Sequence, residues 1–263
     1  MSRAANQNKE KEVRRYYEAL YRAWGAQHWW PAESRFEIIV GAYLTQNTAW
    51  TNVERALAKL RADGLLTVEG IRQVSLLRFE RLIRSSGYFR RKAKRLKTFI
   101  AFLDAEYNGS LDRLFAQPTN DLREQLLSLN GVGPETADSI LLYAGNHPVF
   151  VVDAYTRRIL ERHNILPAKT TYQDIRTLFE RALTPIAEHP PHDNGAERLA
   201  SDIRGVSHSP SPMSTAPRTA VAQVYNEMHG LIVGVGKHYC KKSRPMCEGC
   251  PLQSFLPVTR PQN

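Results

Sequence analysis

The segment LREQLLSLNGVGPETADSILLYAG, residues 122–145, decides the fold of this chain. Leucines recur at helical spacing in its first half, and apolar residues recur at the same spacing in its second half. Between the halves, Gly131 and Gly133 permit positive φ angles, and Pro134 suits the first turn of a helix. The sequence therefore predicts two amphipathic helices joined by a very tight turn.

A turn of this kind points unpaired backbone N–H groups outward at a helix N-terminus. Such groups can hold a phosphate without reading the base sequence. We therefore expect Gly131, Val132 and Gly133 to bind a nucleic-acid backbone. A compact helical corner without a ligand is the alternative interpretation.

An aspartate follows the hairpin at a second distinctive position. Asp153 comes after the apolar run VFVV and directly before an amphipathic helix. An aspartate at the start of a helix is a good N-cap, and without further context that role would be favoured.

These segments together resemble the endonuclease III branch of the helix-hairpin-helix DNA glycosylases. The shared pattern is the LNGVG turn between two helices, followed by VVDAYTRR with Asp153 eighteen residues after Glu135. It extends to EIIVGAYLTQNT and SGYFRRKAKRL upstream and to the Cys240 loop downstream. The resemblance implies an all-α fold of two helical domains, with DNA and a lesion pocket in the cleft between them.

The expected domains follow from this pattern and from composition. We predict a continuous helical domain at 37–150, packed against a second domain formed by residues 1–36 and 151–263. Residues 187–218 are rich in Pro, Ser, His and Gly, which predicts a flexible insertion.

By resemblance, Asp153 is the catalytic carboxylate. Hydrolysis of an N-glycosidic bond develops positive charge on the deoxyribose, which a carboxylate stabilises while it orients or deprotonates water. Bifunctional members of the family carry a lysine two positions after the last hairpin glycine, where it forms a Schiff base that leads to strand cleavage. This position is Glu135, which cannot form an imine. We therefore predict a monofunctional glycosylase, with Glu135 as a second catalytic candidate or simply an exposed acid at a helix start.

Three tryptophans indicate which class of damaged base this protein would remove. Trp29, Trp30 and Trp50 resemble the aromatic pocket of the 3-methyladenine DNA glycosylases of endonuclease III type, which also have Glu in place of the lysine. Stacking on aromatic faces contributes about 1–3 kcal/mol per base, and an electron-deficient alkylated purine adds a cation–π term. Lys237 resembles a further pocket residue. The alternatives are ordinary core for the tryptophans and a phosphate contact for the lysine.

The net charge and further residues that resemble those of the family indicate DNA as the partner. The formal net charge is +10, and Arg90, Arg91 and Lys92 belong to a basic run that we expect to contact DNA, although a solvated helix face is the alternative. The resemblance makes Gln46 and Tyr88 wedges that fill the gap left by a flipped nucleotide; a buried amide and a core tyrosine are the competing interpretations. We expect a monomer that binds double-stranded DNA containing a damaged base.

The first residues are polar, and no stretch approaches the roughly 20 apolar residues of a membrane span. We therefore expect no membrane association and a cytoplasmic location.

The three cysteines lie close together near the C-terminus. Cys240, Cys247 and Cys250 have the C-x6-C-x2-C spacing of the first three ligands in the [4Fe–4S] loop of endonuclease III, but the fourth position is Leu256. A cluster ligated by four cysteines of this loop is thus excluded. We expect an iron–sulfur cluster with a non-cysteine ligand at 240–256, and the alternative is a packing element with basic residues near DNA.

Three other functions remain open from the sequence. A bifunctional enzyme acting on oxidised pyrimidines is disfavoured by Glu135 and the tryptophans. A non-catalytic hairpin module is disfavoured by the position of Asp153. Adenine removal from mismatches normally pairs the Asp with a glutamate in the 37–48 region, and Glu37 lies at the wrong end of its helix.

Overall fold

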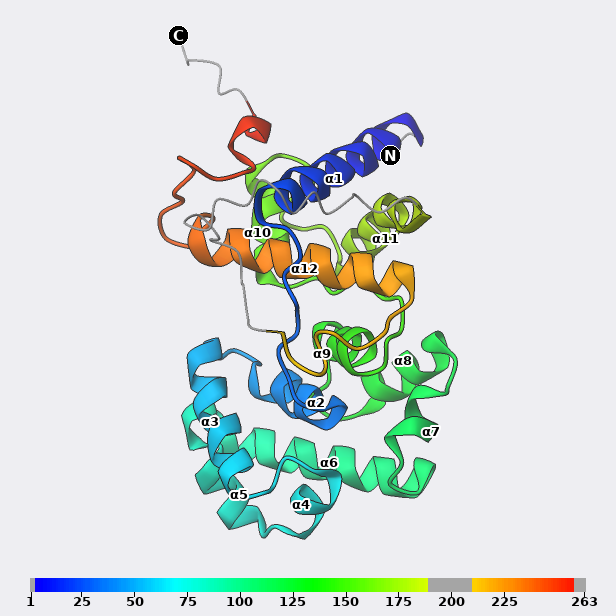
Figure 1. The fold of residues 1–263 in the computed structure, drawn as a ribbon, viewed down its shortest axis with the longest axis vertical. Coiled ribbons are helices and arrows are strands. Elements are labelled where there is room, and N and C mark those ends of the chain that lie inside the picture. Colours follow the sequence, from blue (N-terminus) through cyan, green and yellow to red (C-terminus); the bar gives the residue numbers. More distant parts are fainter. Residues whose placement is uncertain (1–2, 189–209, 258–263) are drawn as a thin grey trace. The chain divides into compact units, whose positions relative to one another are not determined.

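The structure, a computed structural model, describes residues 3–188 and 210–257. All regular secondary structure in these two ranges is helical, which confirms the all-α class (Figure 1). Contacts divide the chain into unit 1, residues 1–31 with 148–263, and unit 2, residues 32–147. The predicted bounds at 36/37 and 150/151 stay predictions, and most of the predicted insertion at 187–218 lies outside the described residues.

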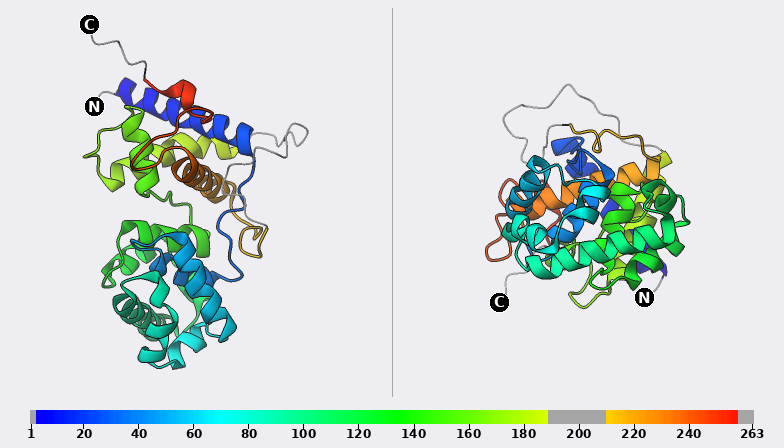
Figure 2. Two further views of the ribbon diagram at one scale, coloured as in Figure 1. Left: turned by 90° about the vertical axis from the view of Figure 1, so that its left-hand side faces the viewer. Right: turned by 90° about the horizontal axis from the view of Figure 1, so that it is seen from below.

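Within its described residues, unit 1 is built on four α-helices and one short turn of 3-10 helix. These are α1 (Arg3–Trp24), α10 (Ala154–Arg162), α11 (Tyr172–Glu188), α12 (Ala220–His238) and η3 (Gln253–Phe255). Helix α12 packs against α1, α10 and α11, and α1 also packs against α11. Figure 2 shows blue α1 beside olive α11 from a second side.

The sequence pattern explains why α12 is central to unit 1. Most residues from Ala222 to Gly236 are buried, so this helix is apolar on nearly every side. In contrast, α1 is amphipathic and buries a single stripe that includes Val13, Tyr16 and Leu20. A helix that is apolar all round is stable only when other helices cover it.

Unit 2 contains the remaining helices. They are α2 (Arg35–Leu44), α3 (Trp50–Ala62), α4 (Val68–Gln73), α5 (Leu76–Leu82), η1 (Arg84–Ser86), α6 (Phe89–Tyr107), α7 (Leu111–Phe115), α8 (Thr119–Ser128), α9 (Pro134–Ser139) and the π-helical segment η2 (Ile140–Ala144). Helix α2 is buried from Phe36 to Leu44 and packs against α3, α6, α9 and η2. The hairpin α8–α9 is therefore attached directly to the core of unit 2.

Within the described ranges, no helix combines the length and the apolar character that a membrane span requires.

Candidate functional site

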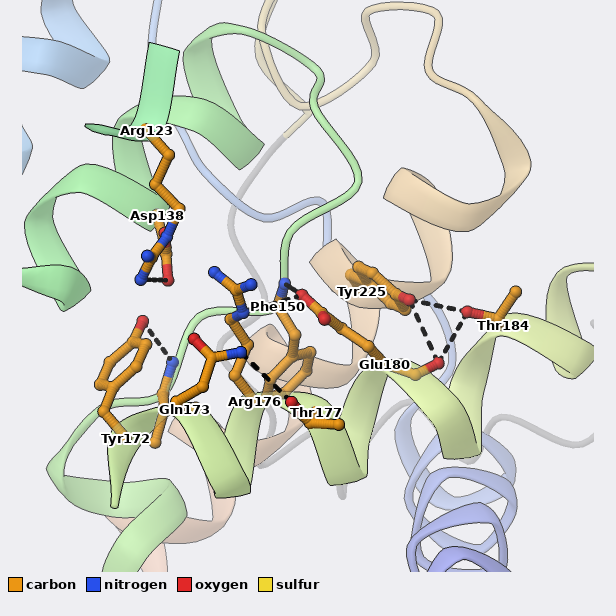
Figure 3. Close-up of polar contacts among 11 residues, drawn as sticks. Arg123, Asp138, Phe150, Tyr172, Gln173, Arg176, Thr177, Glu180, Thr184 and Tyr225 are labelled. Carbon is orange, nitrogen blue, oxygen red and sulfur yellow. Dashed lines mark hydrogen bonds and ion pairs between the residues drawn. The ribbon is translucent and has the colours of Figure 1, made fainter. Parts of the chain in front are cut away.

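An extended strap, residues 148–152, leads to Asp153 in unit 1 and is held by side chains of α11 (Figure 3). The backbone N–H of Phe150 donates to Glu180 Oε1 at 3.1 Å, and that of Val152 donates to the Tyr172 hydroxyl at 3.2 Å. The Phe150 ring stacks on Phe179 with 4.3 Å between centroids. These contacts satisfy buried backbone donors that would otherwise destabilise an irregular segment. The strap thus fixes the position at which Asp153 begins α10.

Asp153 caps α10 and keeps a partly exposed carboxylate. Its Oδ1 accepts hydrogen bonds from the Thr156 backbone N–H at 2.7 Å and the Thr156 hydroxyl at 2.9 Å. Its Oδ2 lies 3.7 Å from Nε2 of His229, and the side chain is 12% exposed. One oxygen is therefore fixed by the helix start, and the second faces a histidine.

His229 lies inside unit 1, on α12. Burial lowers the pKa of its imidazole, and the charge of Asp153 opposes this shift only in part. Its ring packs against Trp29 and Phe150, with centroid distances of 6.2 and 6.4 Å. A neutral imidazole thus connects Asp153 to the tryptophan segment. His229 could not be predicted from the sequence, because nothing in its spacing relates it to position 153.

Helix α12 also anchors the segment before Trp30. Asn226 donates a hydrogen bond to the Trp29 carbonyl, and the Gln27 N–H donates to Glu227 Oε2 at 2.7 Å. Burial raises the pKa of Glu227, while the hydrogen bond from Gln27 acts in the opposite direction. The Trp29 and Trp30 rings lie 5.3 Å apart and both are buried. Unit 1 therefore brings Asp153 and two of the predicted pocket residues together around α12.

The other predicted pocket residues lie elsewhere. Trp50 begins α3 in unit 2, where its indole N–H donates to Glu54 Oε1 at 2.8 Å. Lys237 is exposed in the last turn of α12. Glu135 is exposed in the first turn of α9. Their predicted roles stay predictions.

The hairpin in unit 2 has the two helices that the sequence predicts, clamped by a buried ion pair. Arg123 on α8 binds both carboxylate oxygens of Asp138 on α9, at 2.6 and 3.2 Å, and Asp138 is fully buried (Figure 3). This ion pair was not predicted from the sequence, although both of its residues lie within 122–145.

The turn between the hairpin helices uses its two glycines differently. Gly131 has a φ of +82°, and a Cβ added there would lie 2.5 Å from Arg95 Cδ and overlap the guanidinium. Gly133 has an ordinary φ of −96°, and a Cβ there would meet nothing within 4 Å. The Val132 N–H donates to the Leu129 carbonyl at 3.0 Å, and the Val132 side chain is buried. The buried Val132 side chain therefore packs on the inner side of the turn, and Gly133 is the exposed residue of the turn.

Gln46 makes hydrogen bonds within unit 2. Its Nε2 donates to the Gly131 carbonyl at 3.0 Å and to the Thr136 hydroxyl at 2.9 Å, and its Oε1 accepts from Arg95 at 2.8 Å. Gln46 and Arg95 thus join the end of α2 and helix α6 to the hairpin turn. Entry of Gln46 into a duplex, as predicted for a wedge, would require these bonds to break.

The basic run divides between surface and interior. Tyr88 is 66% exposed in a left-handed backbone conformation, and Arg90 and Arg91 are exposed on the first turn of α6. Lys92 corrects our expectation, because it is buried and donates to the Leu44 carbonyl at 2.8 Å and the Ser86 carbonyl at 2.6 Å. Burial lowers its pKa to about 8. Its ammonium ties loops of unit 2 together and is not available to a phosphate.

The cysteine loop does not fit an iron–sulfur cluster. Cys240, Cys247 and Cys250 line a cavity of about 20 Å³ together with Leu256 and His163. A cavity of this size holds about one water molecule, whereas a [4Fe–4S] core has eight atoms. Among the side chains that the structure describes, no three His, Cys, Asp or Glu form a metal site. The family's fourth ligand is replaced by an apolar side chain that helps to close the cavity.

The comparisons with known proteins agree with this architecture. Residues 40–185 match the model of the HhH-GPD superfamily base excision DNA repair proteins, and the chain belongs to this superfamily. A protein of Methanocaldococcus jannaschii named as a DNA repair glycosylase is 38% identical over 95% of this chain and 97% of its own length. The chain spans about half the length of two chloroplastic endonuclease III homologues of Arabidopsis thaliana.

Two solved structures share the fold. The H. pylori 3-methyladenine DNA glycosylase MagIII, bound to 1,N6-ethenoadenine, has a TM-score of 0.65 and 25% identity, over 87% of this chain and 97% of that one. A non-covalent endonuclease III–DNA complex has a TM-score of 0.67 and 20% identity, over 94% of each chain.

Proposed function

We propose that this chain is a monofunctional DNA glycosylase that hydrolyses the N-glycosidic bond of a damaged base in double-stranded DNA. The carboxylate of Asp153 carries the proposal, because it is held by Thr156 at one oxygen and remains partly exposed. In the reaction the bond between C1′ and the base breaks, water adds its hydroxyl to C1′, and the base leaves with a proton. Asp153 stabilises the positive charge on the sugar and orients the water.

The hairpin supports a DNA partner. Among the described residues, the backbone N–H groups of Gly131 and Gly133 have no acceptor; Gly133 is the N-cap of α9, and Gly131 lies in the turn before it. Such donors at a helix N-terminus bind phosphate oxygens. The exposed Arg90 and Arg91 add positive charge in the same unit. A DNA partner also supports an intracellular location.

Glu135 supports hydrolysis without strand cleavage. It occupies the position at which bifunctional family members have their Schiff-base lysine, and a carboxylate cannot attack the sugar to form an imine.

Trp29 and Trp30 support an alkylated purine, such as 3-methyladenine, as the substrate base. Both rings lie in the segment that α12 anchors beside His229 and Asp153. An alkylated purine is electron-poor and stacks well on indole. Both rings are buried in this structure, so a base can stack on them only after the rings separate from their present neighbours. The similarity to H. pylori MagIII supports the same class of base.

A panel of duplexes tests the proposal. We expect base release from DNA containing 3-methyladenine or 1,N6-ethenoadenine, and no covalent adduct when borohydride is added with abasic DNA. D153N should abolish release while it retains DNA affinity and stability, because Asn caps a helix as well as Asp. Efficient borohydride trapping would contradict the monofunctional assignment, and normal turnover of D153N would contradict the role of Asp153.

A further inference from the structure

The loop that follows α12 is held by two arginines of α10. Arg158 donates through Nε to the Cys240 carbonyl at 2.6 Å and through Nη2 to the Gly236 carbonyl at 3.2 Å. Arg162 donates to the carbonyls of Lys241 at 2.7 Å and Lys242 at 3.0 Å. The two guanidiniums therefore bind four carbonyls in the stretch from residue 236 to 242.

Helix geometry explains why these two side chains act together. Residues four apart lie on the same face of a helix, so Arg158 and Arg162 both face the end of α12. The last carbonyls of a helix lack partners within it and carry partial negative charge, which guanidinium groups satisfy. Gly236 allows the close approach, because a Cβ there would lie 2.7 Å from Tyr155 Cβ and overlap its ring. The docking of α10 on α12 thus brings both arginines to the loop.

The first cysteine takes part in the same contacts. The Cys240 sulfur accepts a hydrogen bond from Arg162 Nη1 at 3.3 Å, and Cys240 is buried. Protein side chains pack in the interior next to the loop. His163 Nδ1 is 2.7 Å from the Tyr16 hydroxyl, and Leu252 is fully buried. The loop therefore has internal support on each side of its cysteines.

We infer that the loop at 240–256 is an arginine-held element whose conformation does not depend on a metal cluster. Its order comes from the bonds of Arg158 and Arg162 to backbone carbonyls and from apolar packing around Leu252 and Leu256. The three cysteines act in it as small packing side chains, of which Cys240 is buried and Cys247 and Cys250 are half-buried.

Limited trypsin digestion of the full-length protein measures the order of the loop directly, because Lys241 and Lys242 are exposed cleavage sites within it. Mass spectrometry assigns each cut to its position. We expect R158Q/R162Q to speed cleavage at these two sites by about tenfold or more, since charged hydrogen bonds that close the loop are lost.

The matched controls are R157Q and C247S/C250S. Arg157 lies on the same helix but donates to the Thr170 carbonyl at 2.8 Å. We expect both controls to be cut at the wild-type rate within about twofold, because neither loses a bond that closes the loop. Cleavage of R158Q/R162Q at the wild-type rate, or cleavage of C247S/C250S much faster than the wild type, would overturn the inference.

Iron content of anaerobically purified wild-type protein gives an independent answer that needs no variant. We expect the wild type to contain no stoichiometric iron and to show no visible absorbance. We also expect C247S/C250S to have the same melting temperature as the wild type. Iron at cluster stoichiometry in the wild type would overturn the inference if C247S/C250S lost both the iron and the order of the loop. This result would count even if R158Q/R162Q fails to fold. These readouts involve no base release, so they stand apart from the proposed activity.

Discussion

Replacing Gly131 by alanine tests how the hairpin turn is built. Gly131 has a φ of +82°, which an L-residue adopts only at a cost, and an added Cβ would overlap Arg95. Arg95 would then have to move and lose its 2.8 Å bond to Gln46, which itself donates to the Gly131 carbonyl. The substitution therefore affects the backbone and the neighbouring network at once.

The expected magnitude follows from these two effects. A left-handed backbone conformation costs a non-glycine residue about 1–2 kcal/mol. Loss of a hydrogen bond to a charged group costs about 1–3 kcal/mol more. We expect G131A to lower the free energy of unfolding by about 2–5 kcal/mol, a large fraction of the stability of a typical domain.

Urea denaturation followed by circular dichroism measures this change, and two other glycines separate its causes. Gly64 has a φ of +67° with open space around its Cβ position, so G64A should show only the backbone cost of about 1–2 kcal/mol. G133A should change stability by less than about 0.5 kcal/mol but weaken binding to duplex DNA, because its new methyl group stands on the open face of the turn. A G131A protein as stable as wild type, or equal destabilisation by G131A and G133A, would refute this account of the turn.

Three further predictions concern buried polar groups. R123M should destabilise the protein by about 3–5 kcal/mol in urea, because it leaves the buried charge of Asp138 without its bidentate guanidinium; R123M/D138L should recover much of the loss, and no recovery would contradict the ion-pair explanation. Burial lowers the pKa of Lys92 from 10.5 to about 8, so folding is penalised while the lysine is charged, and the penalty disappears as pH rises from about 8 to 10.5. Wild type should therefore gain up to about 3 kcal/mol relative to K92M across this window, and parallel stability curves would contradict it. H229F keeps the ring packing but removes the nitrogen 3.7 Å from Asp153, so base release should slow about tenfold at unchanged DNA affinity, and an unchanged single-turnover rate would argue against a role for His229.

The helical hairpin could be predicted from the sequence because its signals are local. Apolar spacing defined the two helices of residues 122–145, and glycines with Pro134 defined the break between them. Helix α2 carries an equally local signal, because its sequence RFEIIVGAYL contains a continuous apolar run. In each case the chemistry of adjacent residues determines the backbone.

The contacts that hold the candidate site could not be predicted in this way. Lys92 belongs to an obviously basic run, but acceptors from two separate loops enclose its ammonium. His229 reaches Asp153 only because α12 packs against α10, 76 positions along the chain. Periodicity reports which face of an element is buried, but not which polar group it will meet there.

Asp153 also has a consequence for how this position should vary among descendants of the protein. Its carboxylate starts α10 through Thr156, so any replacement that cannot accept those hydrogen bonds weakens the helix regardless of chemistry. Asn, Ser and Thr meet the capping requirement, but none of them carries a negative charge. A lineage released from base excision is thus free to drift to these residues without unfolding, while strict retention of aspartate records continued selection for the charge itself.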